Sequence, residues 1–229
     1  MKILFLQIYT HHIAPYFQYV SAINSAYCVK NNYEYKTIIT NVPEGYGFSW
    51  GKLFAIKEEY NNYDYIFFLD SDAVVMNDEI TIENRIKNMK GDILFSENGA
   101  NGGTLINAGA FILKCSDKGK KFIDTILETS LLNEYEKNKN GNYYEQDIIN
   151  ILYSSGNYND IVDIYHMNWI NSHWKYNYSS NDEQFIFHFM SWPIEDKIII
   201  IKKIFYRKFL NNLYDDFKCK YNEPGKYIT

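Results

Sequence analysis

Two carboxylates separated by one residue are the side chains of this sequence best placed to do chemistry. Asp70 and Asp72 directly follow the apolar run 66–69. In an extended segment, side chains at positions i and i+2 point the same way, so both carboxylates can converge on one cation. The pattern predicts a ligand site at this point of the chain.

The apolar run itself indicates where that site lies in a fold. A run as dense as 66–69 is typical of a strand that is buried on both faces, in a parallel sheet covered by helices. Open sheets of this kind bind ligands just beyond the carboxyl ends of their strands. Asp70, Ser71 and Asp72 stand at such an end.

The chain around this run predicts an α/β fold. Residues 2–9 form an expected strand, 14–31 an expected helix and 35–40 a second strand, which together make a βαβ start. Further strands are expected at 92–96, 105–113, 160–165 and 184–190, and further helices at 50–60, 78–89, 117–136 and from 143 onward. The turn after the first strand suits a nucleotide base or ribose, which makes ligand candidates of Gln7, Tyr9 and Thr10.

A lysine lies near the start of the helix expected at 50–60. Ser49 is the expected N-cap, which places Lys52 in the first turn. A cation there opposes the helix dipole, and a bound phosphate would resolve the conflict. An exposed lysine explains the position equally well.

Five other positions have both a functional and a structural interpretation. Asn107 and Gly109 interrupt an apolar strand, either because a ligand comes close or because the strand bulges. Glu145 and Asp147 favour the dipole of a helix N-terminus, which explains them without a catalytic role. His188 lies among aromatic residues, where a hydrogen-bonded core histidine is commoner than a metal ligand.

Composition limits the classes of partner. With 229 residues and 46% hydrophobic content, the chain can bury the core of one domain with a C-terminal extension. A net charge of -5 and a pI near 5.6 argue against a nucleic-acid binder. Three cysteines without a pairing or zinc spacing fit buried, inert thiols in a reducing compartment; they are Cys28, Cys115 and Cys219.

The two ends of the chain indicate where the protein resides. Residues 1–9 are too short and lack a cleavage site for a signal peptide, and no membrane span is expected, so a cytoplasmic location is predicted. Residues 194–217 combine an isoleucine run with basic residues. They predict a helix that packs on the domain or, alternatively, a basic apolar segment that contacts an anionic membrane peripherally.

The order of the motifs resembles that of a known group of enzymes. Ser49-Trp50-Gly51-Lys52 is followed by Asp70-Ser71-Asp72-Ala73, then 105–109, Glu145-Gln146 and His188-Phe189. This order resembles the GT-A glycosyltransferases of the family 34 type, which includes galactosyl-, xylosyl- and mannosyltransferases and carries a DxD motif. The similarity covers residues 2–192.

The resemblance implies a fold and a domain division. The fold class would be α/β of the GT-A type, a Rossmann-like nucleotide-diphospho-sugar transferase with a mixed, mostly parallel sheet flanked by helices. Residues 1–192 would form this domain, and 193–229 a helical extension that packs on it.

The resemblance also implies roles for the candidate residues. Asp70, Asp72 and His188 would hold a divalent metal, Mn²⁺ or Mg²⁺, that carries the pyrophosphate of a nucleotide sugar, with Lys52 stabilising the charge. Asn107 would contact the donor sugar, and Gly109 would leave it room. Glu145 and Gln146 would face the reacting sugar, although the family's acid-acid-Gln occurs here as Tyr144-Glu145-Gln146.

The predicted function is metal-dependent transfer of a sugar, from a UDP-sugar as first choice, to a carbohydrate or glycan acceptor. Retention of anomeric configuration is expected by resemblance; inversion would instead need Asp147 or Glu145 as a base. One rival is a phosphohydrolase of the haloacid dehalogenase type with Asp70 as nucleophile and Asp72 as acid/base. Another is a non-catalytic sugar- or nucleotide-binding domain.

Overall fold

The computed structural model describes residues 1–229 except 41, 45, 99–104, 129–143, 173–183 and 210–229. Its central feature is a six-stranded sheet with the order β2-β1-β3-β6-β5-β7. A second, two-stranded sheet pairs β4 with β8. The strands are β1 (Ile3–Tyr9), β2 (Glu34–Ile39), β3 (Tyr65–Leu69), β4 (Ala73–Val75), β5 (Ile93–Glu97), β6 (Ile106–Lys114), β7 (Val162–Tyr165) and β8 (Ile186–His188).

The large sheet is mixed and mostly parallel, as the sequence predicts. β1 pairs in parallel with β2 and β3, and β5 pairs in parallel with β7. β6 alone runs against its two neighbours, β3 and β5. The first residues of β6 therefore lie at the edge of the sheet where β1, β3 and β5 end.

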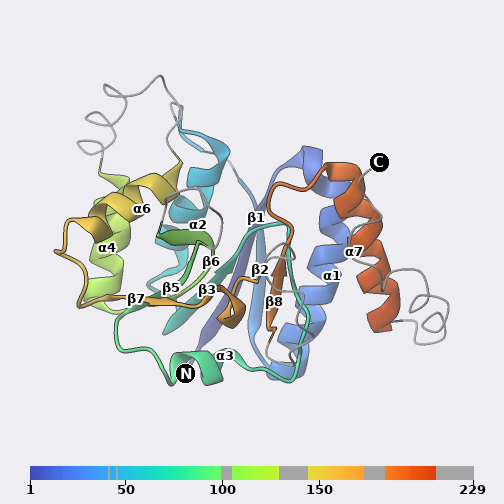
Figure 1. Cartoon of the computed structure of the whole chain (residues 1–229), viewed down its shortest axis with the longest axis horizontal. Coiled ribbons are helices and arrows are strands. Elements are labelled where there is room, and N and C mark those ends of the chain that lie inside the picture. The colour runs from blue at the N-terminus through green and yellow to red at the C-terminus, as the bar shows by residue number, and fades with distance from the viewer. Residues whose placement is uncertain (41, 45, 99–104, 129–143, 173–183, 210–229) are drawn as a thin grey trace.

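Helices cover both faces of this sheet (Figure 1). Side chains alternate along β1, so that Leu4 and Leu6 pack on one side and Phe5 on the other. The first side is covered by α2 (Gly51–Glu59), α4 (Asp117–Leu127) and α6 (Glu145–Ser154), and the second by α1 (Ala14–Asn31) and the short α3 (Ile82–Ile86). Covering both faces explains the dense apolar run of β3, whose Ile66 to Leu69 are fully buried.

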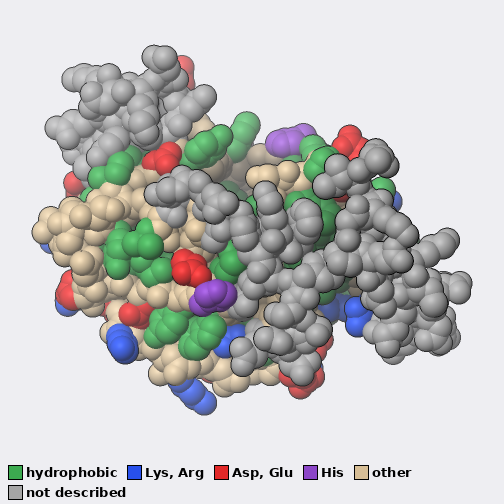
Figure 2. Space-filling view, in the orientation of Figure 1, with side chains coloured by type: hydrophobic (Ala, Val, Ile, Leu, Met, Phe, Trp, Pro, Cys, Tyr) green, Lys and Arg blue, Asp and Glu red, His purple; other side chains and the backbone are tan. Residues whose placement is uncertain are grey.

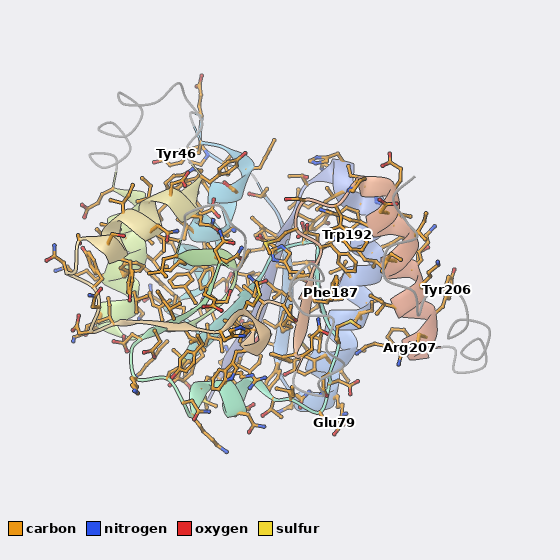
Figure 3. The ribbon with its side chains drawn as sticks, viewed as in Figure 1. Tyr46, Glu79, Phe187, Trp192, Tyr206 and Arg207 are labelled. Carbon is orange, nitrogen blue, oxygen red and sulfur yellow. The ribbon has the colours of Figure 1, made fainter. Side chains whose placement is uncertain are left out.

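The C-terminal helix α7 (Ile194–Phe209) packs against α1. Ile201 is buried there in a cluster that includes Val20 of α1 and Phe189 beside β8. Trp192 joins β8 to this layer, with its ring centroid 6.4 Å from that of Phe187, and Figure 3 shows both. The described part of residues 194–217 is therefore a packed helix.

The outer side of α7 carries Tyr206 and Arg207, which are exposed (Figure 3). Two of its lysines contact other parts of the protein: Lys208 pairs with Asp78, and Lys202 lies over the ring of Tyr19. The domain boundary at residue 192 and a peripheral membrane contact stay predictions.

Several element bounds differ from the prediction. Ser49 is not an N-cap, because it lies inside the 3₁₀ turn η2 (Phe48–Trp50), which begins after the extended Gly47. The helix expected at 78–89 is only the short α3. Its N-cap is Thr81, whose side chain accepts a hydrogen bond from the Asn84 N–H. The helix expected at 117–136 ends at Leu127, where Glu128 has extended backbone. The helix expected at 194–217 is described as far as Phe209, and residues 129–136 and 210–217 of the two predictions lie outside the described residues.

Two observations concern the surface and membranes. Among the described residues, no helix combines the length and the apolar character that crossing a membrane requires. Lysine and arginine side chains are scattered among acidic ones on the face seen in Figure 2. A cytoplasmic location stays a prediction.

Candidate active site

The two carboxylates lie in a turn between β3 and β4. Contrary to the sequence prediction, the backbone is not extended through Asp72: β3 ends at Leu69, and the Asp70 carbonyl accepts a hydrogen bond from the Ala73 N–H at 3.0 Å. The carboxylates converge because the turn folds them together, at the carboxyl end of β3.

A histidine joins them from the far end of the chain. Pairing of β4 with β8 sets Ala73 opposite His188, and the Phe189 N–H donates to the Asp72 carbonyl at 2.9 Å. His188 Nε2 then lies 3.0 Å from Asp72 Oδ1 and 3.8 Å from Asp70 Oδ2. One potential ligand atom from each of the three residues lies within 4.8 Å of the others.

Gly109 makes the space in which this group forms. A Cβ atom there would lie 2.2 Å from His188 Cε1 and 2.9 Å from Asp70 Oδ2, which is far too close. The Gly109 carbonyl also accepts a hydrogen bond from the Asp70 N–H at 2.7 Å. The close approach inferred from the sequence is therefore that of two neighbouring side chains.

Lys52 is in the first turn of α2, as predicted, but it is buried with only 3% of its surface exposed. Its Nζ lies 3.0 Å from Asp70 Oδ1 and 2.7 Å from Glu145 Oε1. It also donates to the Ala108 carbonyl at 3.1 Å. Two carboxylates thus offset the lysine's conflict with the helix dipole.

Charge around Lys52 sets the ionisation of this side of the site. Burial alone would lower the pKa of Lys52, but the charges of Asp70 and Glu145 raise it above its ordinary value. Burial raises the pKa of Asp70, against the opposing effects of Lys52 and His188. Glu145 Oε2 is buried and has no hydrogen-bond partner among the residues that the structure describes.

A second lysine, which the sequence analysis did not assign to the site, pairs with Asp72. Lys197 Nζ of α7 lies 2.6 Å from Asp72 Oδ2, and its side chain is 12% exposed. Burial would raise the pKa of Asp72, but His188 and Lys197 together lower it below its ordinary value. Lys197 shares a helical face with Ile201 and Ile204. A lysine on this apolar face is the sequence feature that could have pointed to a buried partner.

Side chains from β1 and α1 hydrogen-bond to the turn that carries Asp70 and Asp72. Gln7 is fully buried, and its Nε2 donates to the Asp70 carbonyl at 3.0 Å. Its Oε1 accepts hydrogen bonds from Asn24 and Tyr35, so the side chain holds the turn in place. Ser71 hydrogen-bonds with the buried Tyr16 hydroxyl.

Tyr9 and Thr10 lie at the end of β1. The ring of Tyr9 stacks on Phe17 with a centroid distance of 4.4 Å, and Thr10 Oγ1 lies 2.8 Å from His12 Nδ1. Their contact with a nucleotide, like that proposed for Gln7, stays a prediction.

The N-terminus of α6 is tied to the start of β6. Gln146 Oε1 accepts a hydrogen bond from the Ala108 N–H at 2.9 Å, and Asn150 exchanges two bonds with the Ile106 backbone. The Asp147 carboxylate accepts from the Tyr144 N–H at 3.2 Å in a capping box. Asp147 therefore has the capping role that explained it from sequence, and its role as a base stays a prediction.

Asn107 points into a buried polar cluster. Its Oδ1 accepts hydrogen bonds from the Gly109 N–H at 2.8 Å and from Asn171 Nδ2 at 2.6 Å. Asn171 Nδ2 also donates to Ser96 Oγ, and its Oδ1 lies 2.8 Å from His188 Nδ1. The sequence analysis assigned Asn171 no role, because nothing in that segment distinguishes one asparagine from its neighbours.

The bulge that the sequence offered as an alternative to close ligand approach is present in this strand. The register between β5 and β6 shifts after Phe95, which pairs with Phe111, whereas Ser96 pairs with Asn107. The shift leaves Ala108, Gly109 and Ala110 without a partner on β5, and Ala108 and Gly109 contact the site.

Comparison with known proteins relates this arrangement to one class of enzyme. The model of the galactosyl transferase GMA12/MNN10 family matches residues 9–97, from the end of β1 through β5. That span contains Lys52, Asp70 and Asp72. A comparison with curated protein sequences finds no match.

Solved structures agree on the fold. A glycosyltransferase involved in glycosylation of the major capsid of PBCV-1 superposes with a TM-score of 0.73 at 15% identity, covering 89% of this chain and 100% of that one. The galactosyltransferase LgtC, in complex with donor and acceptor sugar analogues, gives 0.59 at 13% identity, covering 89% and 96%. The glycosyltransferase GlyE of Streptococcus pneumoniae TIGR4 gives 0.56 at 12% identity, covering 91% and 63%.

These findings confirm the predicted resemblance and fold. The chain has the GT-A fold of glycosyltransferases, and its sequence resembles family 34 over the part that carries the Asp-x-Asp motif.

Proposed function

We propose that this protein is a metal-dependent glycosyltransferase that moves a sugar from a nucleotide-diphosphate sugar, a UDP-sugar first, to a carbohydrate or glycan acceptor. The observation that carries the proposal is the convergence of Asp70, Asp72 and His188 at the carboxyl edge of a GT-A sheet. The family model points to the same class.

The three residues fit a divalent cation. Two carboxylates and one imidazole are a donor set suited to Mn²⁺ or Mg²⁺, and their atoms lie close enough to share one ion. Gly109 allows His188 and Asp70 to come together, because a Cβ atom there would collide with both. When bound, a divalent cation there would neutralise charge that develops on the leaving diphosphate.

The surrounding side chains supply binding and orientation. Lys52 holds Asp70 and Glu145 in place and adds positive charge beside the leaving group. Glu145 Oε2 is buried without a hydrogen-bond partner among the described residues, and it would accept a hydrogen bond from a donor-sugar hydroxyl that reached it. Gln146 fixes the β6 backbone next to that sugar.

We assign the reaction a retaining outcome on resemblance alone. Acceptor and leaving group would then occupy the same face of the sugar, and a phosphate oxygen of the leaving group would take the acceptor's proton. Asp147 is committed to capping α6, so Glu145 is the better base if the enzyme inverts.

The first experiment identifies the donor. Thermal shift with UDP-, GDP- and dTDP-sugars, each with and without Mn²⁺, should show stabilisation by one nucleotide class only when the metal is present, because ligands that bind the native state raise apparent stability. Equal shifts without metal would contradict metal dependence.

The second experiment tests the carboxylates. The double variant Asp70→Asn/Asp72→Asn should lose metal-dependent donor binding and turnover. A matched control is Asp124→Asn/Asp160→Asn, which removes two surface carboxylates that pair with Lys57 and Lys118. Unchanged donor affinity and turnover in the first variant would overturn the proposal.

Donor hydrolysis separates the rival functions. A transferase should slowly release nucleoside diphosphate, a phosphohydrolase free phosphate, and a binding domain neither. The GT-A fold favours the transferase, and no contact in the site favours the other two.

A further inference from the structure

A chain of hydrogen bonds links the backbone of β6 to the imidazole of His188. It runs from the Gly109 N–H to Asn107 Oδ1, from Asn171 Nδ2 to the same Oδ1, and ends between Asn171 Oδ1 and His188 Nδ1. Asn107, Asn171 and His188 are 5%, 1% and 3% exposed, so bulk water does not compete with these bonds.

The donor and the acceptor of each hydrogen bond follow from the backbone N–H group at the start of the chain. A backbone N–H can only donate, so the Asn107 atom beside Gly109 must be its carbonyl oxygen. The Asn171 atom that meets this oxygen must then be its NH₂ group, which also donates to Ser96 Oγ. The remaining Asn171 atom is an oxygen, and only a proton on His188 Nδ1 completes the last bond.

We propose that Asn171 is a positioning residue that keeps a proton on His188 Nδ1, so that Nε2 is the ring nitrogen left to bind a metal in place of its hydrogen bond to Asp72. Nε2 is the ring nitrogen that faces Asp72 Oδ1 at 3.0 Å and Asp70 Oδ2 at 3.8 Å. When one ring nitrogen of a histidine binds a metal, the other usually donates its N–H to an oxygen atom of the protein, and this hydrogen bond orients the ring.

The proposal also assigns Asn107 a role. Its Oδ1 already accepts two hydrogen bonds, so Asn107 orients Asn171 and acts on the site through it. The metal-binding consequence rests on the proposed function, whereas the tautomer of His188 does not.

The direct test is ¹⁵N NMR of the metal-free protein labelled at its five histidines. Signals absent from a His188→Gln variant identify the ring. Nδ1 should carry a proton in the metal-free protein, where Nε2 can also donate to the Asp72 carboxylate at 3.0 Å. A ring protonated on Nε2 alone overturns the proposal.

Variants then link the tautomer to metal affinity. Asn171→Leu removes the acceptor and should give mixed tautomers and Mn²⁺ binding weaker by about 10- to 100-fold, measured from free Mn²⁺ by EPR. Asn171→Asp keeps an oxygen beside Nδ1 and should keep the Nδ1–H form. Asn150→Leu, which removes an asparagine that bonds β6 without contacting His188, should leave the tautomer unchanged.

The outcomes separate the two proposals. A folded Asn171→Leu variant with wild-type tautomer and Mn²⁺ affinity overturns the role of Asn171, and the wild-type spectrum decides the tautomer even if that variant does not fold. A wild-type protein that shows the Nδ1–H form but binds no Mn²⁺ overturns the metal site of the proposed function and leaves the tautomer standing.

Discussion

At the scale of single residues, Gly109 is the position where one added methyl group has the largest effect on the site. Gly109→Ala should push His188 and Asp70 apart, cost about 1–3 kcal/mol of stability and weaken Mn²⁺ binding by about 10-fold or more. Titration of Mn²⁺ followed by EPR measures this. The control is Gly47→Ala, whose Cβ would meet its nearest neighbour at 4.0 Å; equal affinities in both variants would contradict the prediction.

Lys52 matters for its charge, since it is the cation that two buried carboxylates share. Lys52→Met leaves Asp70 and Glu145 without it and should lower the free energy of unfolding by about 3–5 kcal/mol. Urea denaturation of the metal-free protein measures the loss. Lys57→Met, which breaks an exposed pair with Asp124, should cost no more than about 1 kcal/mol. Similar losses in the two variants would show that the buried network contributes little.

What could be predicted of the site depends on sequence separation. Asp70, Ser71 and Asp72 were identified because their signal is local: two acids at the end of a buried strand. His188 was favoured as a metal ligand only through the family resemblance, since its contact with Asp72 spans 116 positions. Asn171 was missed because no local pattern distinguishes it, and Lys197 because a lysine on an apolar helical face does not reveal its partner; their roles exist only once β8 and α7 are in place.

At the scale of elements, α7 contributes to the site and does more than cover α1. Lys197→Met leaves Asp72 Oδ2 without its cation, so we expect the metal-free protein to lose about 1–3 kcal/mol. For a chain of this size that lowers the melting temperature by about 2–12 °C.

Bound Mn²⁺ should reduce this difference, because the ion replaces the missing charge. Thermal melts with EDTA and with Mn²⁺ test both parts, with Lys202→Met of the same helix as control. A deficit that Mn²⁺ leaves unchanged would show that Lys197 and the ion do not act on the same carboxylate.

Element types were predictable, whereas their bounds and local geometry were less so. The strands were found because burial on both faces demands uninterrupted apolar runs, as in β1 and β3. Ser49 was misassigned because capping residues are also common in short 3₁₀ turns, and α2 continues directly from one. The Asp70–Asp72 turn was missed because the apolar residues of β3 and β4 flank it on both sides.

At the scale of the whole molecule, Asp78 connects three parts of the chain. It pairs with Lys30 of α1 and Lys208 of α7. Burial would raise the pKa of Asp78, but the two lysines lower it below its ordinary value. A lowered folded-state pKa stabilises the protein above the unfolded pKa of about 3.9, and this stabilisation is lost as pH falls through the folded value.

Asp78→Asn should therefore cost up to about 1 kcal/mol at pH 7, since the pair is partly exposed, and progressively less as the pH falls below about 4. Urea midpoints of wild type and variant across this range measure the effect, and 1 M NaCl should also reduce it. A difference that is constant from pH 7 to pH 2 would contradict the assignment.

The pairing of β4 with β8 has a further consequence for how the protein is made. Asp72 contacts His188 and Lys197, which lie 116 and 125 positions later. Contacts of such separation form late, after most loop-closure entropy has been lost. A chain emerging from the ribosome presents both acids long before their histidine has been synthesised. The proposed metal thus cannot nucleate folding, and we expect Mn²⁺ to slow unfolding while leaving the refolding rate nearly unchanged.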